Sequence, residues 1–164
     1  MRSRAALGNH PVHPMLVPIP IGAFFLALVG DLVYRGDASR AFWYDLSEVC
    51  IGVGIAAAVI ATVAGAIDYF SIKMSGQAFR TATWHGLLNL LLVALYATSF
   101  FLRRHGAAAS GSRWVVAASL AFAGFGLLAV TGWLGGKLAF EHRVGVLERL
   151  NVVPSRRKDE RAAS

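Results

Sequence analysis

Four long apolar stretches, separated by short polar links, set the strongest constraint on what this chain can fold into. They cover residues 15–34, 46–67, 85–102 and 114–140, and most of the charged residues lie outside them. A helix rises 1.5 Å per residue, so about 20 residues cross a hydrocarbon core of about 30 Å. The sequence therefore predicts an all-α integral membrane protein, a four-helix bundle with short loops.

Composition agrees with a membrane protein and disfavours a nucleic-acid partner. The chain is 56% apolar and 15% charged, whereas soluble domains are about 25% charged. A net charge of +7 and a pI near 10.3 would suggest nucleic acid binding in a soluble protein. Here the Lys and Arg residues lie in links and in the tail, which favours anionic lipid headgroups as the partner. The single cysteine, Cys50, can form no internal disulfide.

We divide the chain into an N-terminal His-Pro segment (1–14), a four-span membrane domain (15–147) and a charged tail (148–164). The tail has the composition of a disordered basic extension. The segment before Asp31 has no small-x-small cleavage site, so we interpret it as a retained first span rather than a signal peptide. The sequence shows no internal repeat that we recognise.

Orientation is predicted from the distribution of Lys and Arg. With four spans, both termini and the second link share one side, and that side carries eleven of the sixteen Lys and Arg residues. The positive-inside rule places this side in the cytoplasm. We therefore expect a multi-pass protein of the cell inner membrane with both termini cytoplasmic.

Histidines gather at the face that carries the termini. His10 and His13 precede the first span, His85 opens the third and His142 follows the fourth, while Asp68 ends the second span at the same face. Neighbouring helices in a bundle lie about 10 Å apart, so these side chains can converge. Imidazoles ligate haem iron and transition metals. The predicted cofactor is haem b, or alternatively a transition metal. The residues proposed for haem are His10, His13, His85, Asn89 and His142, and those for a metal are His10, His13, Asp68, His85 and His142.

The local sequence around the histidines limits this site. In HPVHP each histidine precedes a proline, which favours extended backbone, and residues three apart in such a run lie about 9 Å apart. His10 and His13 are then too far apart to ligate one ion. Asn89 lies one turn after His85, where its amide can orient the ring. The alternative is that these are ordinary interfacial histidines. His105, in the third link, lies on the opposite side.

Other polar and small residues have simpler interpretations. Asp31, near the far end of the first span, is expected to pair with Arg35 one turn later. Small residues repeat every four positions at Ala57, Ala61 and Gly65, and again at Gly132 and Gly136. Such stripes usually allow close helix packing in lipid; the alternative is a flat cofactor lying against them.

Several of these motifs resemble one known family. HPVHPMLVPIPIG, GAID at the end of the second stretch, H-x-x-x-N at His85 and GWLGGKLAFEH with the following VGV are similar to the bacterial membrane family called domain of unknown function 2231. The resemblance covers about residues 8–147, although Arg143 stands where members usually have glycine. It implies a four-span membrane domain without an assigned activity. Some members are fused to a Rieske-type iron–sulfur domain, which implies electron transfer. This chain has no cysteine pair for a cluster, so a redox partner would be separate.

Three functions remain open from the sequence. The first is a cofactor-binding membrane subunit that acts in electron transfer, rather than a stand-alone enzyme. The second is a structural or assembly subunit of a membrane complex, with the small-residue stripes as docking surfaces, and the same stripes would also suit a homo-oligomer. The third, a small transporter, is disfavoured because few polar groups lie at mid-membrane depth, where transport sites usually occur.

Overall fold

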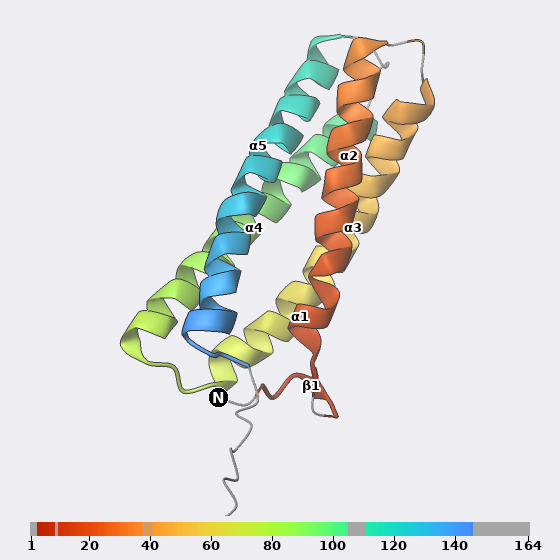
Figure 1. The fold of residues 1–164 in the computed structure, drawn as a ribbon. Coiled ribbons are helices and arrows are strands. Elements are labelled where there is room, and N and C mark those ends of the chain that lie inside the picture. Colours follow the sequence, from red (N-terminus) through yellow and green to blue (C-terminus); the bar gives the residue numbers. More distant parts are fainter. Residues whose placement is uncertain (1–2, 9, 38, 40, 105–110, 146–164) are drawn as a thin grey trace, which may run out of the picture.

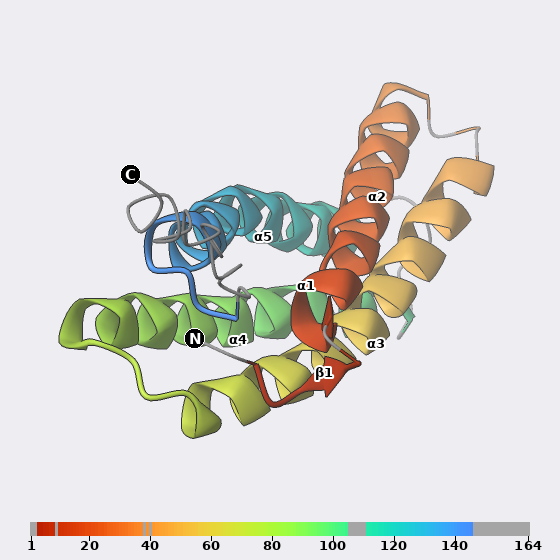
Figure 2. The same ribbon diagram turned by 60° about the horizontal axis from the view of Figure 1, so that its bottom comes forward.

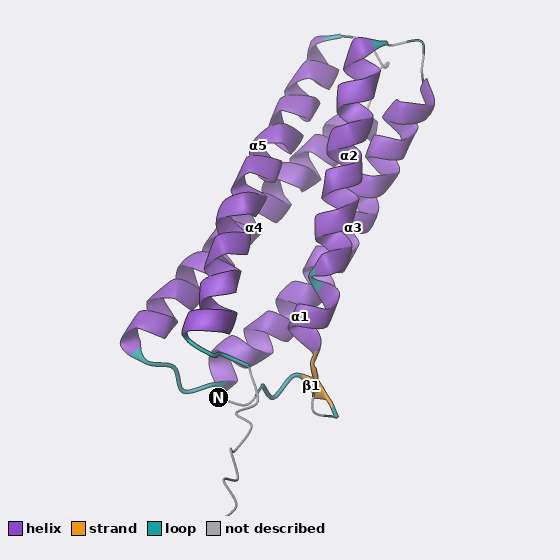
Figure 3. Ribbon diagram, viewed as in Figure 1, coloured by secondary structure: helices purple, strands orange, loops and turns teal. Residues whose placement is uncertain are grey.

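The computed structural model describes residues 3–8, 10–37, 39, 41–104 and 111–145. Within this part of the chain, four helices are long and apolar enough to cross a membrane. Figure 1 and Figure 3 show them as an elongated bundle, with the N-terminal segment at one end. The predicted all-α membrane fold is confirmed. His105 and the tail after residue 145 lie outside the described residues.

The elements follow the apolar stretches but extend beyond them. A short β-hairpin precedes two consecutive helices that together form the first span, and a π-helical turn ends the fourth. The elements are β1 (Ala6–Leu7), β2 (His10–Pro11), α1 (Val12–Leu16), α2 (Pro18–Gly36), α3 (Ala41–Ser71), α4 (Gly76–Arg104), α5 (Ser112–Gly136) and η1 (Lys137–Glu141).

The sequence suggested an extended His-Pro segment, but only its first part is extended. His10 lies in β2, but His13 lies in α1 although Pro14 follows it. Proline is tolerated in the first turn of a helix, because the amide hydrogens there have no partner within the helix. The amide of Val17 donates to the carbonyl of His13 at 3.2 Å, which links α1 to α2. His13 therefore lies at the head of the first span.

The third span begins earlier than predicted. α4 starts at Gly76, so nine helical residues precede His85, which was expected to open the span. These residues are supported by the end of α3: Tyr69 Oη lies 2.8 Å from Thr83 Oγ1, and the Tyr69 ring stacks on Phe79. Hydropathy marks where a helix enters the hydrocarbon core. It does not mark where the helix starts.

The four helices pack as two pairs. α2 packs along α3 and α4 packs along α5, and the pairs meet through α3–α4 and α2–α5 contacts. α2 and α4 therefore occupy opposite corners of the bundle, as the tilted view in Figure 2 shows. The centre holds a cluster of buried side chains: Phe24, Ala27, Ile51, Leu92, Tyr96 and Ala121. Most large apolar side chains on the outer faces are exposed, as a lipid-facing surface requires.

Candidate functional site

Two histidines from opposite corners of the bundle meet inside it. The imidazole of His13, on α1, and that of His85, on α4, have ring centroids 6.3 Å apart and planes at 88°. Both side chains are half-buried. Seventy-two residues of sequence separate them, so only the packing of the two helix pairs brings them together. This contact is the strongest candidate for a functional site in the described chain.

Hydrogen bonds to backbone carbonyls place a proton on Nδ1 of both rings. Nδ1 of His13 lies 2.7 Å from the carbonyl oxygen of Ala61, and Nδ1 of His85 lies 3.0 Å from that of Thr131. A carbonyl only accepts, so each Nδ1 carries the proton and donates. With the proton on Nδ1, Nε2 is the ring nitrogen that remains for a metal. Metal-bound histidines commonly have this arrangement, in which the other ring nitrogen donates to a carbonyl or carboxylate.

Each ring lies against a glycine on the helix that supplies the carbonyl. A Cβ added to Gly65 would lie 3.0 Å from Nδ1 of His13, and one added to Gly135 would lie 3.2 Å from Cε1 of His85. Each glycine follows its carbonyl residue by four positions, one turn along the helix. The absence of a side chain at these two positions lets the imidazoles approach the helix backbone.

Asn89 contacts His85 as its spacing suggested. Its amide nitrogen donates to the carbonyl of His85 at 2.8 Å and lies 3.3 Å from Nε2 of the same ring. The same amide nitrogen lies 3.4 Å from Nδ1, so it packs against the imidazole between the two ring nitrogens and not along the Nε2 lone pair. Asn89 thus holds the ring in place.

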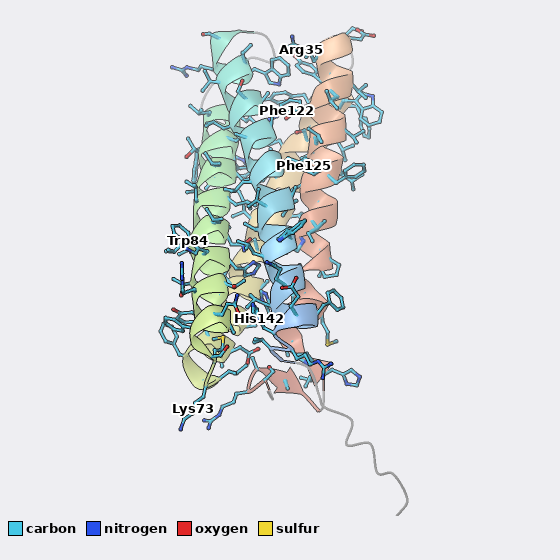
Figure 4. All side chains as sticks on the ribbon, turned by 60° about the vertical axis from the view of Figure 1, so that its left-hand side comes forward. Arg35, Lys73, Trp84, Phe122, Phe125 and His142 are labelled. Carbon is cyan, nitrogen blue, oxygen red and sulfur yellow. The ribbon has the colours of Figure 1, made fainter. Side chains whose placement is uncertain are left out.

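The other predicted ligands do not join the pair. His10 is exposed in the β-hairpin, where it is paired with Leu7. Nε2 of His142 lies 3.5 Å from Thr81 Oγ1, and Figure 4 shows this residue near the same end of the bundle as Lys73, with Arg35 at the other end. Among the described residues, no group of three or more His, Cys, Asp and Glu side chains could hold a metal ion. The expected multi-histidine metal centre is therefore not formed.

Asp68 has a different role from the predicted one of metal ligand. Its carboxylate accepts from Ser3 Oγ at 2.8 Å, from the amide of Arg4 at 3.0 Å and from the amide of Ala5 at 3.1 Å. These bonds tie the N-terminal segment to the end of α3. With three donors on its carboxylate, Asp68 is a structural anchor.

A buried ion pair at the other end of the bundle escaped the sequence analysis. Asp31 was expected to pair with Arg35, but its two oxygens accept from Nη1 and Nη2 of Arg103 at 2.8 and 2.7 Å. Both side chains are almost fully buried. Ser47 Oγ donates to Asp31 at 2.8 Å, and Nε of Arg103 donates to Ser99 Oγ at 3.3 Å. The carboxylate and guanidinium are thus satisfied within the protein, as buried charges require.

Stacked rings fill the bundle between the histidines and this ion pair. Phe24 and Tyr96 lie face to face, with centroids 3.7 Å apart and planes at 6°. The hydroxyl of Tyr96 is buried and has no hydrogen-bond partner. A shallow hollow occurs elsewhere, near the end of α4, where Thr98, Phe101, Leu102 and Arg113 line it. The interior around Phe24 and Tyr96 is packed, so it offers no polar path across the membrane.

Only one of the two predicted small-residue stripes faces a neighbouring helix. Ala61 is buried and Gly65 contacts His13, so the first stripe does face a neighbour. A Cβ added to Gly132 or Gly136 would meet nothing within 4 Å, whereas Gly135, between them, contacts His85. The second stripe is therefore not the packing face of α5 in the chain.

Comparison with known families agrees with this architecture. A family model described as a predicted membrane protein, domain of unknown function 2231 (DUF2231), matches residues 9–148. The chain belongs to the DUF2231 family. Neither the curated proteins nor the solved structures provide a match. The matched region contains both histidines of the pair, both glycines behind them and the buried ion pair.

Proposed function

We propose that this DUF2231 protein binds one haem b through Nε2 of His13 and Nε2 of His85 and takes part in electron transfer at the membrane. The observation that carries the proposal is the pair of Nδ1–H to carbonyl bonds, which leaves a lone pair on both Nε2 atoms. Two metal–nitrogen bonds of about 2 Å plus the half-widths of two rings add to about 6 Å. The observed centroid separation of 6.3 Å fits two rings on one metal.

The number of ligands favours haem over a bare metal ion. Zinc sites usually have three or four protein ligands, but the described residues offer two imidazoles and no third acidic or thiol group beside them. A porphyrin supplies four nitrogens itself, so two histidines complete the coordination of its iron. We therefore rank haem b first and a transition metal second.

The residues around the pair would determine how a bound haem behaves. An iron with two imidazole ligands can gain and lose an electron without an open position for oxygen. The carbonyls of Ala61 and Thr131 hold the Nδ1 protons, which would fix the tautomer and orientation of each ring for a ligand bond at Nε2. Asn89 would keep its bond to the backbone carbonyl of His85 and its contact with the ring.

Further parts of the proposal concern location and partners. We propose that the face carrying the histidine pair lies in the cytoplasm of a cell with an inner membrane, because eleven of the sixteen Lys and Arg residues belong to that side. The electron donor or acceptor would be a separate protein. The chain's single cysteine cannot hold an iron–sulfur cluster.

A structural or assembly subunit is the second candidate, and one observation favours it. The same two Nδ1–H bonds join α1 to α3 and α4 to α5, so the histidines would strengthen helix packing even without a ligand. Each interhelical bond in a membrane protein contributes about 0.6 kcal/mol on average. In that case the pair would affect stability and bind nothing.

An absorption spectrum distinguishes the two candidates. The protein is purified in detergent with haem supplied during expression, and spectra are recorded with and without dithionite. We expect a Soret band and sharp reduced α and β bands, at one haem per chain. His13→Ala and His85→Ala should each abolish the reduced bands, while His10→Ala and His142→Ala serve as matched controls and should keep them.

The opposite result would support the structural role. If no haem copurifies and none binds after addition of ferric haem, and elemental analysis finds no stoichiometric metal, the cofactor proposal is wrong. Loss of stability in His13→Ala and His85→Ala without any spectral change would then identify the pair as a packing contact.

A further inference from the structure

The two helix pairs repeat one pattern of side chains with the same spacing. In α1 and α2, Phe24 lies eleven positions after His13, and Asp31 lies seven positions after Phe24. In α4, Tyr96 lies eleven positions after His85, and Arg103 lies seven positions after Tyr96. Each residue contacts its counterpart across the bundle. The contacts are the His13–His85 ring pair, the Phe24–Tyr96 stack and the Asp31–Arg103 ion pair.

The second helices of the two pairs, α3 and α5, also carry glycines at matching intervals. Gly54 contacts Phe24 and Gly124 contacts Tyr96, because an added Cβ would lie 2.5 and 2.8 Å from those rings. Eleven residues later in each helix, Gly65 and Gly135 contact the two imidazoles. The carbonyls that bind the rings also lie at equivalent positions, one turn before the glycine.

A rotation relates the pair of α2 and α3 to the pair of α4 and α5. α2 and α4 both run away from the histidine end and lie at opposite corners, and α3 and α5 both return. Exchanging α2 with α4 and α3 with α5 therefore corresponds to a half-turn about an axis along the bundle. Parallel repeats of this kind, with an axis along the membrane normal, occur in other membrane proteins.

We infer that the four-span chain is an internal duplication of a two-helix unit, that the proposed haem lies on the axis relating the units with one imidazole from each, and that Asp31 and Arg103 are positioning residues that fix how the units pair. The placement of haem rests on the proposed function. The duplication and the role of the ion pair do not, since they depend on protein contacts alone.

At the equivalent positions Asp31 and Arg103, the two units carry opposite charges. Pairing the first unit with the second places Asp31 against Arg103. If the first units of two chains paired with each other, aspartate would lie against aspartate. If two second units paired, arginine would lie against arginine. Buried like charges cost several kcal/mol, so this position selects the pairing in which His13 meets His85.

A charge-exchange cycle in the full chain tests this role. The variants are Asp31→Arg, Arg103→Asp and the double exchange, and the readouts are melting temperature in detergent and one-haem binding. Because each single variant would bury two like charges side by side, we expect both to melt far lower. The double exchange should recover most of the melting temperature and also the haem spectrum. Arg103→Lys, which keeps the charge, should recover part of both.

Different outcomes separate this inference from the proposed function. A double exchange no more stable than the single variants would overturn the pairing role. If haem never binds but the exchange restores the melting temperature, the haem proposal fails and the duplication stands. If haem binds and either His13→Ala or His85→Ala keeps the full six-coordinate spectrum, the haem is not on the axis.

Discussion

Asp31 and Arg103, seventy-two residues apart, form a two-bond ion pair inside the bundle with oxygen–nitrogen distances of 2.8 and 2.7 Å. The pair joins the first span to the third, and Ser47 and Ser99 complete its hydrogen bonds. Removing one partner would leave the other charge buried and unpaired.

We predict that Arg103→Gln lowers the free energy of unfolding by roughly 3–5 kcal/mol, the cost of breaking a buried pair. Arg104→Gln is the matched control. Arg104 pairs with Glu48 at 3.2 Å, but its side chain is 62% exposed, and exposed pairs contribute less than about 1 kcal/mol. Reversible unfolding in mixed micelles measures both. Equal losses in the two variants would contradict the prediction.

The orphan hydroxyl of Tyr96 gives a prediction of the opposite sign. Tyr96 Oη is buried with no hydrogen-bond partner, so Tyr96→Phe removes an unsatisfied polar group and keeps the stack on Phe24. We expect the free energy of unfolding to rise by about 1 kcal/mol. Tyr44→Phe is the control: Tyr44 Oη donates to the carbonyl of Arg103 at 3.3 Å, so the loss of its hydroxyl should destabilise. A destabilised Tyr96→Phe would mean that its hydroxyl has a partner.

The glycines behind the imidazoles should respond alike to substitution. Gly65→Ala and Gly135→Ala each force a ring to move, and we expect each to cost about 1–3 kcal/mol, as overpacked cores do. Gly132→Ala is the control on the same helix as Gly135, with open space around it. It should be neutral or stabilising by up to about 1 kcal/mol, since alanine favours helix. Chemical denaturation of the three variants checks this. An unaffected Gly135→Ala would show that the contact is loose.

Asp68→Ala should release the N-terminal segment and leave any haem spectrum unchanged. The carboxylate binds Ser3, Arg4 and Ala5, so hydrogen exchange at residues 3–7 should accelerate and proteases should cleave there sooner. Glu141→Gln is the control, because its contact with Lys137 at 3.7 Å is exposed. Unchanged hydrogen exchange at residues 3–7 in Asp68→Ala would contradict the anchoring role of this carboxylate.

The sequence predicted the spans because hydropathy reports contact with lipid directly. It also placed His13 and His85 at one face, since an even number of crossings follows from the spans alone. The spacing in HPVHP indicated that His10 and His13 would not ligate one ion, but the sequence did not show which of them would face His85, nor that His142 would stay apart. Their distance depends on how the chain turns at the helix ends, at β2 and at η1, and neither turn has a strong sequence signal.

The ion pair and the repeat were missed for related reasons. Arg103 closes the apolar third stretch, so it was assigned to the polar link, and the local rule of pairing one turn away gave Arg35 to Asp31. The repeat keeps few identical residues, among them the histidines at 13 and 85, and its offset is 72 in the first helix of each unit but 70 in the second. The intervals of eleven and seven residues between His, aromatic and charged positions were the available signal.

The ion pair also has a consequence for synthesis at the ribosome. An unpaired aspartate inside a span raises the cost of insertion by about 2.5–3.5 kcal/mol. Arg103 is made seventy-two residues after Asp31, which takes roughly 4 to 14 s at ordinary translation rates. During that interval the first two spans carry an unpaired aspartate, until the third span delivers its partner.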